Sequence, residues 1–479
     1  MSAKRRGSLA FPINNLRRYV TLLTQQIAIG ASLIVKHPFT PPPVPTWPLH
    51  LALFVAVVRA TADYQEHIVE DISDIRHMID TFFYYLPKLP MMHIVPYKLL
   101  IPAHGRGFPG VLELLEQSET AHRALPGSWI ADSKVWSKIM KMPIAQSAKG
   151  SKDPYAAREG EQVIFYTHGG GYFICSTATH REMLWRISRA TGRRIFSVDY
   201  RLAPEHPYPA ALQDAMHAFH HLTDPQGVGF DPKNVTAAGD SAGGGLSIAL
   251  MMYQRDHGLP MASKAFLLSF NPISFYCSGK DKMKTLARHP YISPLWGSLE
   301  NLPPILIQCG EAERLRDECI LFTYKAGGCF GNLNKLPFQL ESTVRRDQTS
   351  QVELDIYPGM VHVFQAIPFL PESSMALQRM LEFMQRKEAD AAAVEETIGM
   401  EVTEEAGEEA DDAQEEKVEV DEIVMMKGLD VVVAGKLMKE LVVKSRRMED
   451  LPAYLELRED DVRLEEVVLT SAAATTTRA

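Results

Sequence analysis

The feature that most constrains this chain is a serine at a sharp turn between two apolar segments. Ser241 stands at the centre of Gly239-Asp240-Ser241-Ala242-Gly243, a G-x-S-x-G sequence. Residues 234–238 have the pattern of a short buried strand, and residues 246–252 that of an apolar helix. A serine in such a turn adopts a strained backbone and needs small neighbours. The pattern favours a strand–turn–helix unit that presents a nucleophile. A glycine–serine turn without chemistry is the alternative.

A second motif, His168-Gly169-Gly170-Gly171-Tyr172, lies about 70 residues upstream, directly after the apolar run 162–167. That run predicts a central strand. Consecutive glycines let the backbone approach a ligand and turn its N–H groups toward it, as an oxyanion requires. A flexible loop is the alternative. His168 is interpreted as a loop-positioning residue, because the catalytic base should follow the acid in chain order.

The order serine, acid, histidine places both partners after Ser241. His362 is the best candidate for the base. It follows the alternating strand 352–357 and the strand-breaking pair Pro358-Gly359. It is therefore predicted on a loop at the C-terminal end of a strand, where such sheets place their chemistry. An ordinary surface histidine is the alternative.

The acid is less sharply defined by the residues themselves. The apolar run 303–309 predicts another core strand, and Glu311, Glu313 and Asp317 all follow it. A triad acid accepts a hydrogen bond from the imidazole and stabilises imidazolium. A position just past the strand end favours Glu311 or Glu313.

These motifs together resemble the hormone-sensitive-lipase-like family of α/β-hydrolases. The resemblance covers about residues 120–385 and rests on residues 168–172, 198–211, 239–244, 315–318 and 357–362. Ser293-Pro294-Leu295 is similar to the steryl-deacetylase and arylacetamide-deacetylase branches.

The resemblance implies a mostly parallel central sheet flanked by helices, with an N-terminal helical cap. It implies a serine hydrolase that acts through an acyl-enzyme on a small or medium hydrophobic ester, acetyl esters included, without metal or cofactor. The family places Asp-Pro where this chain has Glu313-Arg314, so Glu313 is the expected acid, Glu311 is the reserve, and Asp317 is structural. The implied oxyanion donors are the backbone N–H groups of Gly170, Gly171 and Ala242.

The 479-residue chain is expected to have four parts. Residues 1–120 form a helical cap or a membrane-associating segment, and residues 121–387 form the catalytic domain. Residues 388–423 contain sixteen acids and one lysine, which predicts a disordered linker. Residues 424–479 have helix-like apolar spacing of unknown role. The net charge of −9 argues against nucleic acid as a partner.

The apolar segment 19–35 is at the lower limit for a membrane span and contains two glutamines. A cap or interfacial helix is favoured over a true span, so cytoplasmic and endoplasmic-reticulum-associated locations both stay open. Five cysteines without a C-x-x-C motif predict buried thiols and weakly favour a reducing compartment. His217, His220 and His221 are interpreted as ordinary helix residues rather than metal ligands.

Two other function classes stay open. One is a non-catalytic ligand-binding protein on the same fold, against which the presence of His362 argues. The other is an amide hydrolase or acyltransferase, because the residues do not reveal whether water or another nucleophile meets the acyl-enzyme. The oligomeric state is unknown.

Overall fold

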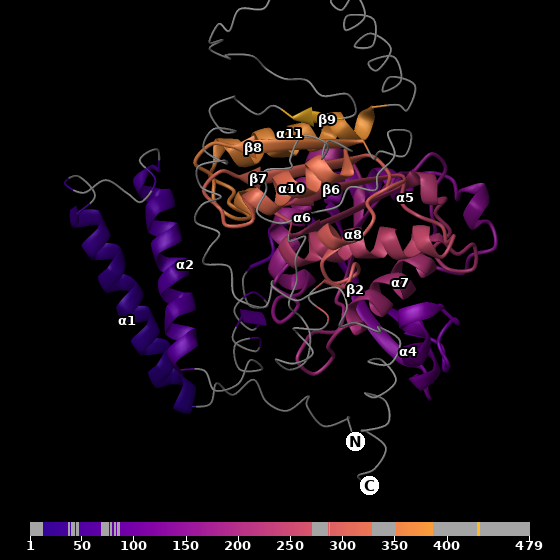
Figure 1. The fold of residues 1–479 in the computed structure, drawn as a ribbon, viewed down its shortest axis with the longest axis horizontal. Coiled ribbons are helices and arrows are strands. Elements are labelled where there is room, and N and C mark those ends of the chain that lie inside the picture. Colours follow the sequence, from indigo (N-terminus) through magenta and orange to yellow (C-terminus); the bar gives the residue numbers. More distant parts are fainter. Residues whose placement is uncertain are drawn as a thin grey trace, which may run out of the picture. The chain divides into compact units, whose positions relative to one another are not determined.

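The structure is a computed structural model that describes residues 13–36, 39, 44, 47–68, 76, 79–80, 83, 87–270, 286, 288–327, 351–386 and 429–431. The chain divides into two compact units, Met1–Met78 and Ile79–Ala479. In the first unit, helices α1 (Ile13–Lys36) and α2 (Leu49–Ile68) pack against each other (Figure 1). Among the described helices, none has both the length and the apolar character needed to cross a lipid bilayer.

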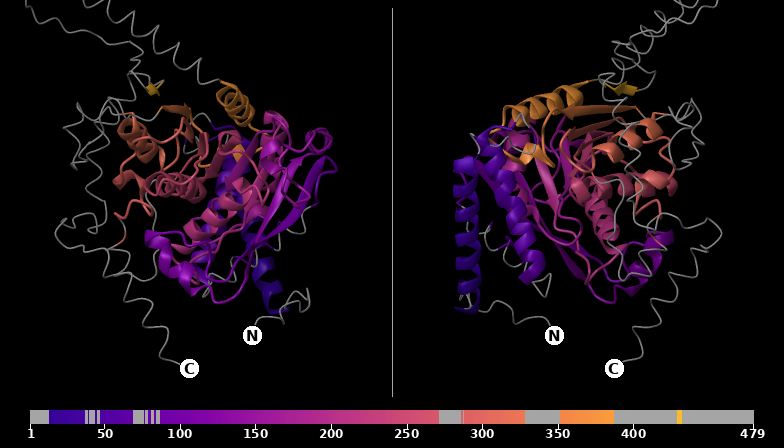
Figure 2. Two further views of the ribbon diagram at one scale, coloured as in Figure 1. Left: turned by 90° about the vertical axis from the view of Figure 1, so that its right-hand side faces the viewer. Right: turned by 60° about the vertical axis from the view of Figure 1, so that its left-hand side comes forward.

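A mixed sheet forms the centre of the second unit (Figure 1 and Figure 2). Its described strands are β1 (Met92–Ile101), β2 (Arg123–Asp132), β3 (Val163–Thr167), β4 (Arg194–Val198), β5 (Val235–Asp240), β6 (Lys264–Leu268), β7 (Ile305–Gly310), β8 (Val352–Tyr357) and β9 (Leu429–Val431). They lie in the order β1-β2-β4-β3-β5-β6-β7-β8-β9. Strand β2 runs antiparallel to both of its neighbours, β1 and β4, and the other described pairs are parallel.

The middle strands are buried along almost their whole length because both faces of the sheet are covered. Every residue of β3 is buried. Phe165 belongs to one hydrophobic core, while Ile164 and Tyr166 belong to the other, as the two-residue repeat of a strand requires. The strand therefore contributes to both cores at once. At its carboxyl end, the hydroxyl of Thr167 donates to the carbonyl of Gly243 at 2.7 Å.

Helices cover both faces of the sheet. They are α4 (Glu113–Ser118), α5 (Ser133–Met140), α6 (Thr177–Thr191), α7 (Ala210–Thr223), α8 (Ser241–Asp256), α10 (Arg316–Ala326) and α11 (Pro371–Gln385). Apolar residues of α7, α8 and α10 fill one core, and those of α6 and α11 fill the other. The expected mostly parallel sheet flanked by helices is confirmed.

The two edge strands of the sheet, β1 and β9, come from segments toward the two ends of the chain. Strand β1 lies before the domain boundary expected at residue 120 and pairs with β2 along its whole length. The acidic segment 388–423 lies outside the described residues. Of the segment 424–479, expected to be helical, only β9 is described, and it is a strand.

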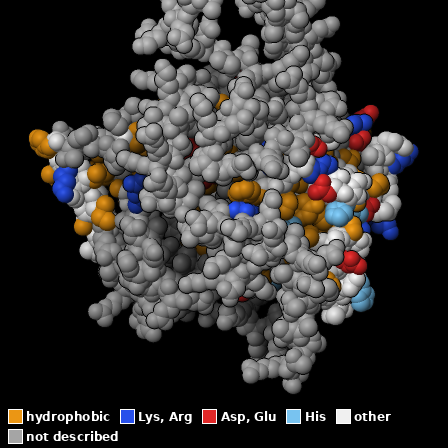
Figure 3. Space-filling model, viewed as in Figure 1, with side chains coloured by type: hydrophobic (Ala, Val, Ile, Leu, Met, Phe, Trp, Pro, Cys, Tyr) orange, Lys and Arg blue, Asp and Glu red, His pale blue; other side chains and the backbone are white. Residues whose placement is uncertain are grey.

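Described side chains of both charges lie intermixed along the right-hand side of the view in Figure 3. Exposed acids and bases also form pairs, as Lys233 and Asp231 do at 2.9 Å. Such exposed pairs contribute at most about 1 kcal/mol each. The two apolar cores, rather than surface charge, therefore stabilise the sheet on which the site is built.

Candidate active site

The serine turn has the geometry that its sequence predicts. Strand β5 ends at Asp240 and α8 begins at Ser241, whose φ of 49° lies in the left-handed region that few non-glycine residues adopt. A Cβ added at Gly243 would lie 2.1 Å from the carbonyl oxygen of Thr167. The second glycine of the motif is thus required by the close approach of α8 to β3.

His362 lies on the loop after β8, as expected. Its Nε2 is 3.0 Å from Oγ of Ser241, within hydrogen-bond distance. The His362 side chain is 42% exposed. A histidine in this position can take the hydroxyl proton of the serine and remain open to an incoming substrate.

The structure places the three candidate acids in different environments. Glu313 has a fully buried side chain, and its Oε2 lies 3.6 Å from Nδ1 of His362. Glu311 instead accepts a hydrogen bond from the backbone N–H of Gly359 at 2.9 Å. Asp317 lies in the first turn of α10 and pairs with Arg316. Of the three, Glu313 is the one brought to His362. The 3.6 Å separation is longer than a hydrogen bond, as is common before substrate binds.

Ser269, which the sequence reasoning missed, connects the acid to the histidine loop. Its hydroxyl donates to Oε2 of Glu313 at 2.6 Å and accepts from the backbone N–H of Val363 at 3.0 Å. The N–H of Gly310 also donates to Oε2, at 3.2 Å. The only signal in the sequence was its position directly after the apolar run that forms β6.

The glycine loop after β3 has the backbone that exposes N–H groups. Gly170 and Gly171 have φ values of 109° and 62°. Neither N–H donates to a protein acceptor among the described residues. Ala242 is the second residue of α8, and the first N–H groups of a helix have no intrahelical acceptor. These three N–H groups are therefore available for a ligand.

Asp240, the residue before the nucleophile, holds this loop from behind. Its Oδ1 accepts from the N–H of Gly169 at 2.9 Å and from the hydroxyl of Tyr166 at 2.6 Å, and its Oδ2 lies 3.2 Å from Nε2 of His180. Burial opposes ionisation of Asp240, but the charge of His180 and hydrogen bonds from His180 and Tyr166 outweigh it, so its pKa falls to about 2. Burial lowers the pKa of His180, but Asp240 more than offsets this and the net shift is upward.

His168 lies in the same cluster, apart from the proton path. Its ring stacks on Tyr200 with centroids 4.3 Å apart, and burial, together with the charge of His180, lowers its pKa to about 4. The hydroxyl of Tyr200 donates to the carbonyl of His168 at 2.6 Å. A neutral, stacked imidazole fits the loop-positioning role expected for it.

The helix histidines have protein partners. Nε2 of His217 lies 2.7 Å from a carboxylate oxygen of Glu116, and Nε2 of His221 lies 2.6 Å from the hydroxyl of Tyr97. In the part of the chain that the structure describes, Cys309, Glu313 and Cys319 bring their donor atoms close enough together to hold a metal ion. Cys175, Cys309 and Cys319 are free thiols.

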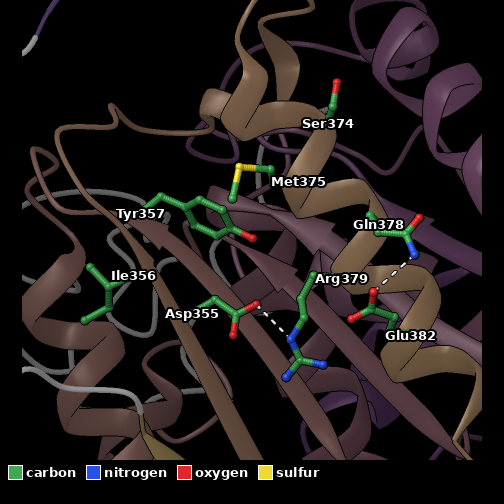
Figure 4. A pocket seen from close by; sticks show the side chains of 8 residues that line it. All are labelled: Asp355, Ile356, Tyr357, Ser374, Met375, Gln378, Arg379 and Glu382. Carbon is green, nitrogen blue, oxygen red and sulfur yellow. Dashed lines mark hydrogen bonds and ion pairs between the residues drawn. The ribbon is translucent and has the colours of Figure 1, made fainter.

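A groove of about 680 Å³ lies between β8 and α11, outside the triad candidates (Figure 4). It is lined by Asp355, Ile356, Tyr357, Ser374, Met375, Gln378, Arg379 and Glu382. Arg379 crosses it to pair with Asp355 at 3.4 Å, and it also contacts Glu353. Charged groups that already pair with one another make this groove a poor site for an apolar ester.

Known proteins resemble this chain over its central region. A family model described as the alpha/beta hydrolase fold matches residues 164–283. An acetyl-hydrolase of Streptomyces hygroscopicus is 31% identical over 247 residues, covering 46% of this chain and 75% of the relative. An esterase of Acinetobacter venetianus is 29% identical over 265 residues, which cover 50% of this chain and 80% of the relative. The solved structure of an esterase from the bacterial hormone-sensitive lipase family is 27% identical. The match covers 66% of this chain and 91% of the esterase, with a TM-score of 0.45.

Proposed function

Because the chain belongs to the hormone-sensitive-lipase-like family of α/β-hydrolases, we propose that Ser241, His362 and Glu313 form a catalytic triad. The chain is a carboxylic-ester hydrolase, as are its relatives named acetyl-hydrolase and esterase. The observation that carries the triad is the 3.0 Å contact between Nε2 of His362 and Oγ of Ser241.

The reaction begins with proton transfer. Nε2 of His362 takes the hydroxyl proton as Oγ of Ser241 attacks the ester carbonyl, which forms the new C–O bond and a tetrahedral oxyanion. The buried carboxylate of Glu313 stabilises the imidazolium across 3.6 Å, a distance that shortens as charge develops. The imidazolium then protonates the leaving alcohol, and the acyl group remains on Ser241.

The oxyanion is held by the N–H groups of Gly170, Gly171 and Ala242. Asp240 stabilises the loop by accepting the N–H of Gly169, which leaves the next two N–H groups for the oxyanion. Losing one such donor typically costs about 3 kcal/mol of transition-state stabilisation. In the second half of the cycle, His362 takes a proton from water as the water attacks the acyl carbon. The bond between the acyl carbon and Oγ of Ser241 then breaks, the imidazolium returns its proton to Oγ, and the carboxylic acid leaves.

The substrate class that fits best is a small or medium hydrophobic ester, acetyl esters included. The relative named acetyl-hydrolase supports the short acyl group. The half-exposed His362 supports access from solvent.

The test combines covalent labelling with turnover. The wild type is expected to take up a fluorophosphonate label and to hydrolyse p-nitrophenyl acetate and butyrate. Ser241→Ala should lose the label and lose at least about 10³-fold in kcat. Ser247→Ala, a buried serine on the same helix that hydrogen-bonds to Thr167, is the matched control and should keep its label. Labelling that survives in Ser241→Ala would refute the triad.

We also propose that residues 19–35 bind a membrane surface. On α1 the side chains of Ile27, Ile34 and Val35 are 65%, 53% and 68% exposed, and the helix ends at the basic Lys36. Exposed apolar residues beside a cation are typical of interfacial helices.

A further inference from the structure

We propose that Cys309, Cys319 and Glu313 form a binding site for one thiophilic divalent cation, Zn²⁺ or Cd²⁺, and that occupancy inhibits ester hydrolysis. The site lies directly behind the proposed triad. Its inhibitory effect rests on the proposed role of Glu313 as the acid, whereas cation binding itself does not.

The three donors converge from consecutive pieces of the fold. Cys309 lies near the end of β7, Glu313 in the connection that follows, and Cys319 in α10 (Figure 1). One ligand atom from each lies within 4.8 Å of the others. Both cysteines are fully buried, and so is the side chain of Glu313. Two thiols and a carboxylate are a donor set that suits Zn²⁺ and its soft relatives.

Glu313 has an oxygen to spare for such an ion. Its Oε2 faces Ser269 and His362, but its Oε1 is buried and has no hydrogen-bond partner among the described residues. A buried carboxylate oxygen without a partner is costly, and a cation would satisfy it. This orphaned atom is evidence for a ligand independent of the pair of cysteines.

Charge balance allows the ion to enter a buried place. Binding breaks two S–H bonds, forms two S–metal bonds and one O–metal bond, and releases two protons to solvent. The ion and two thiolates together replace two neutral thiols, so the net charge of the cluster stays at that of the Glu313 carboxylate. The site therefore avoids the large cost of burying an uncompensated charge.

Ligand geometry explains why binding would inhibit. A tetrahedral ion with metal–sulfur bonds of about 2.3 Å brings two sulfurs to about 3.8 Å and sulfur and oxygen to roughly 3.5 Å. The ligand atoms, now up to 4.8 Å apart, must close by as much as about 1 Å. Glu313, whose Oε2 now lies 3.6 Å from Nδ1 of His362, would move toward the ion and share its negative charge with it. The imidazolium would lose its stabilising partner.

Binding is measured on the reduced full-length chain with Cd²⁺, whose thiolate charge-transfer absorption in the near ultraviolet is independent of activity. One Cd²⁺ per chain is expected, displaced by Zn²⁺. Cys309→Ser and Cys319→Ser should each lose the band, and Cys175→Ser should keep it. If the wild type gives no band, or a band that both substitutions leave intact, the site does not exist. This wild-type result decides the matter even where a variant fails to fold.

Inhibition is measured as the ratio of p-nitrophenyl butyrate hydrolysis with and without Zn²⁺, within each variant. The wild type should lose at least about tenfold, slowly because the site is buried, and a chelator should restore it. Hydrolysis by Cys309→Ser and by Cys319→Ser should be insensitive to Zn²⁺. A band without inhibition would overturn the coupling to Glu313, and fluorophosphonate labelling of Ser241 would then tell whether the triad itself had failed.

Discussion

The ion pair behind the nucleophile makes a quantitative prediction for Asp240→Asn. Asparagine keeps the shape of the side chain but removes the negative charge that faces His180 at 3.2 Å. The pKa of Asp240 falls from 3.8 to about 2 on folding. That difference corresponds to about 2 kcal/mol of free energy of unfolding at neutral pH. Because His180 also loses its partner in a buried place, we expect a total loss of about 2–4 kcal/mol.

The sign of the pH dependence follows from the two pKa directions. The folded-state pKa of Asp240 is lowered, so its contribution is complete above about pH 4 and is lost as the pH falls toward 2. The folded-state pKa of His180 is raised, so its contribution is present below 6.5 and is lost as the pH rises through the folded value. The pair should therefore stabilise the fold most between about pH 4 and 6.5.

The assay is urea unfolding followed by circular dichroism for wild type and Asp240→Asn at pH 3, 5 and 7. The difference should be largest at pH 5 and should narrow at pH 3. Asp231→Asn is the matched control, because Asp231 is partly exposed and pairs with the exposed Lys233. It should cost at most about 1 kcal/mol. Equal losses in both variants, or a difference for Asp240→Asn that does not vary with pH, would refute the reasoning.

The remaining predictions concern the acid and the N-terminal helix. Glu313→Ala should lower kcat by about 10³- to 10⁴-fold, because the imidazolium loses its anion, and Ser269→Ala by about tenfold with KM little changed. Glu311→Ala should lose far less than Glu313→Ala in the same p-nitrophenyl butyrate assay, and the opposite ranking would mean that Glu311 is the acid. The double variant Ile27→Gln, Val35→Gln should sediment less with anionic vesicles than the wild type, since it removes exposed apolar area. Equal sedimentation of both would contradict membrane binding through this helix.

Sequence patterns predicted the centre of the fold well because the central strands obey a simple rule. Residues 163–166 are apolar without interruption, as burial on both faces of a sheet favours, and β3 occupies 163–167. Strand β1 was missed for the opposite reason. It lies at the edge of the sheet, is only partly buried along most of its length, and contains Pro96, so it lacks the apolar run of a core strand.

The residues of the site likewise divide into those that a local motif identifies and those that no local motif identifies. Ser241 and His362 stand in local contexts that identify them, whereas Glu311 and Glu313 follow the same strand two residues apart. Only the path of the connection decides that one carboxylate reaches Gly359 and the other reaches the histidine. Ser269 belongs to no motif, because its role comes from contacts with residues 44 and 94 positions away. Long-range convergence of this kind leaves no periodicity in a sequence.

The contact between Gly243 and Thr167 has a consequence for engineering. Because the backbone of Gly243 lies directly against that of Thr167, the serine turn and the start of the glycine loop form one tightly packed block. Homologous enzymes recombined between these two motifs should fail unless both come from one parent. Changes meant to alter rate or selectivity are then better made outside this block, in the described connections that follow β7 and β8, where Glu313 and His362 lie.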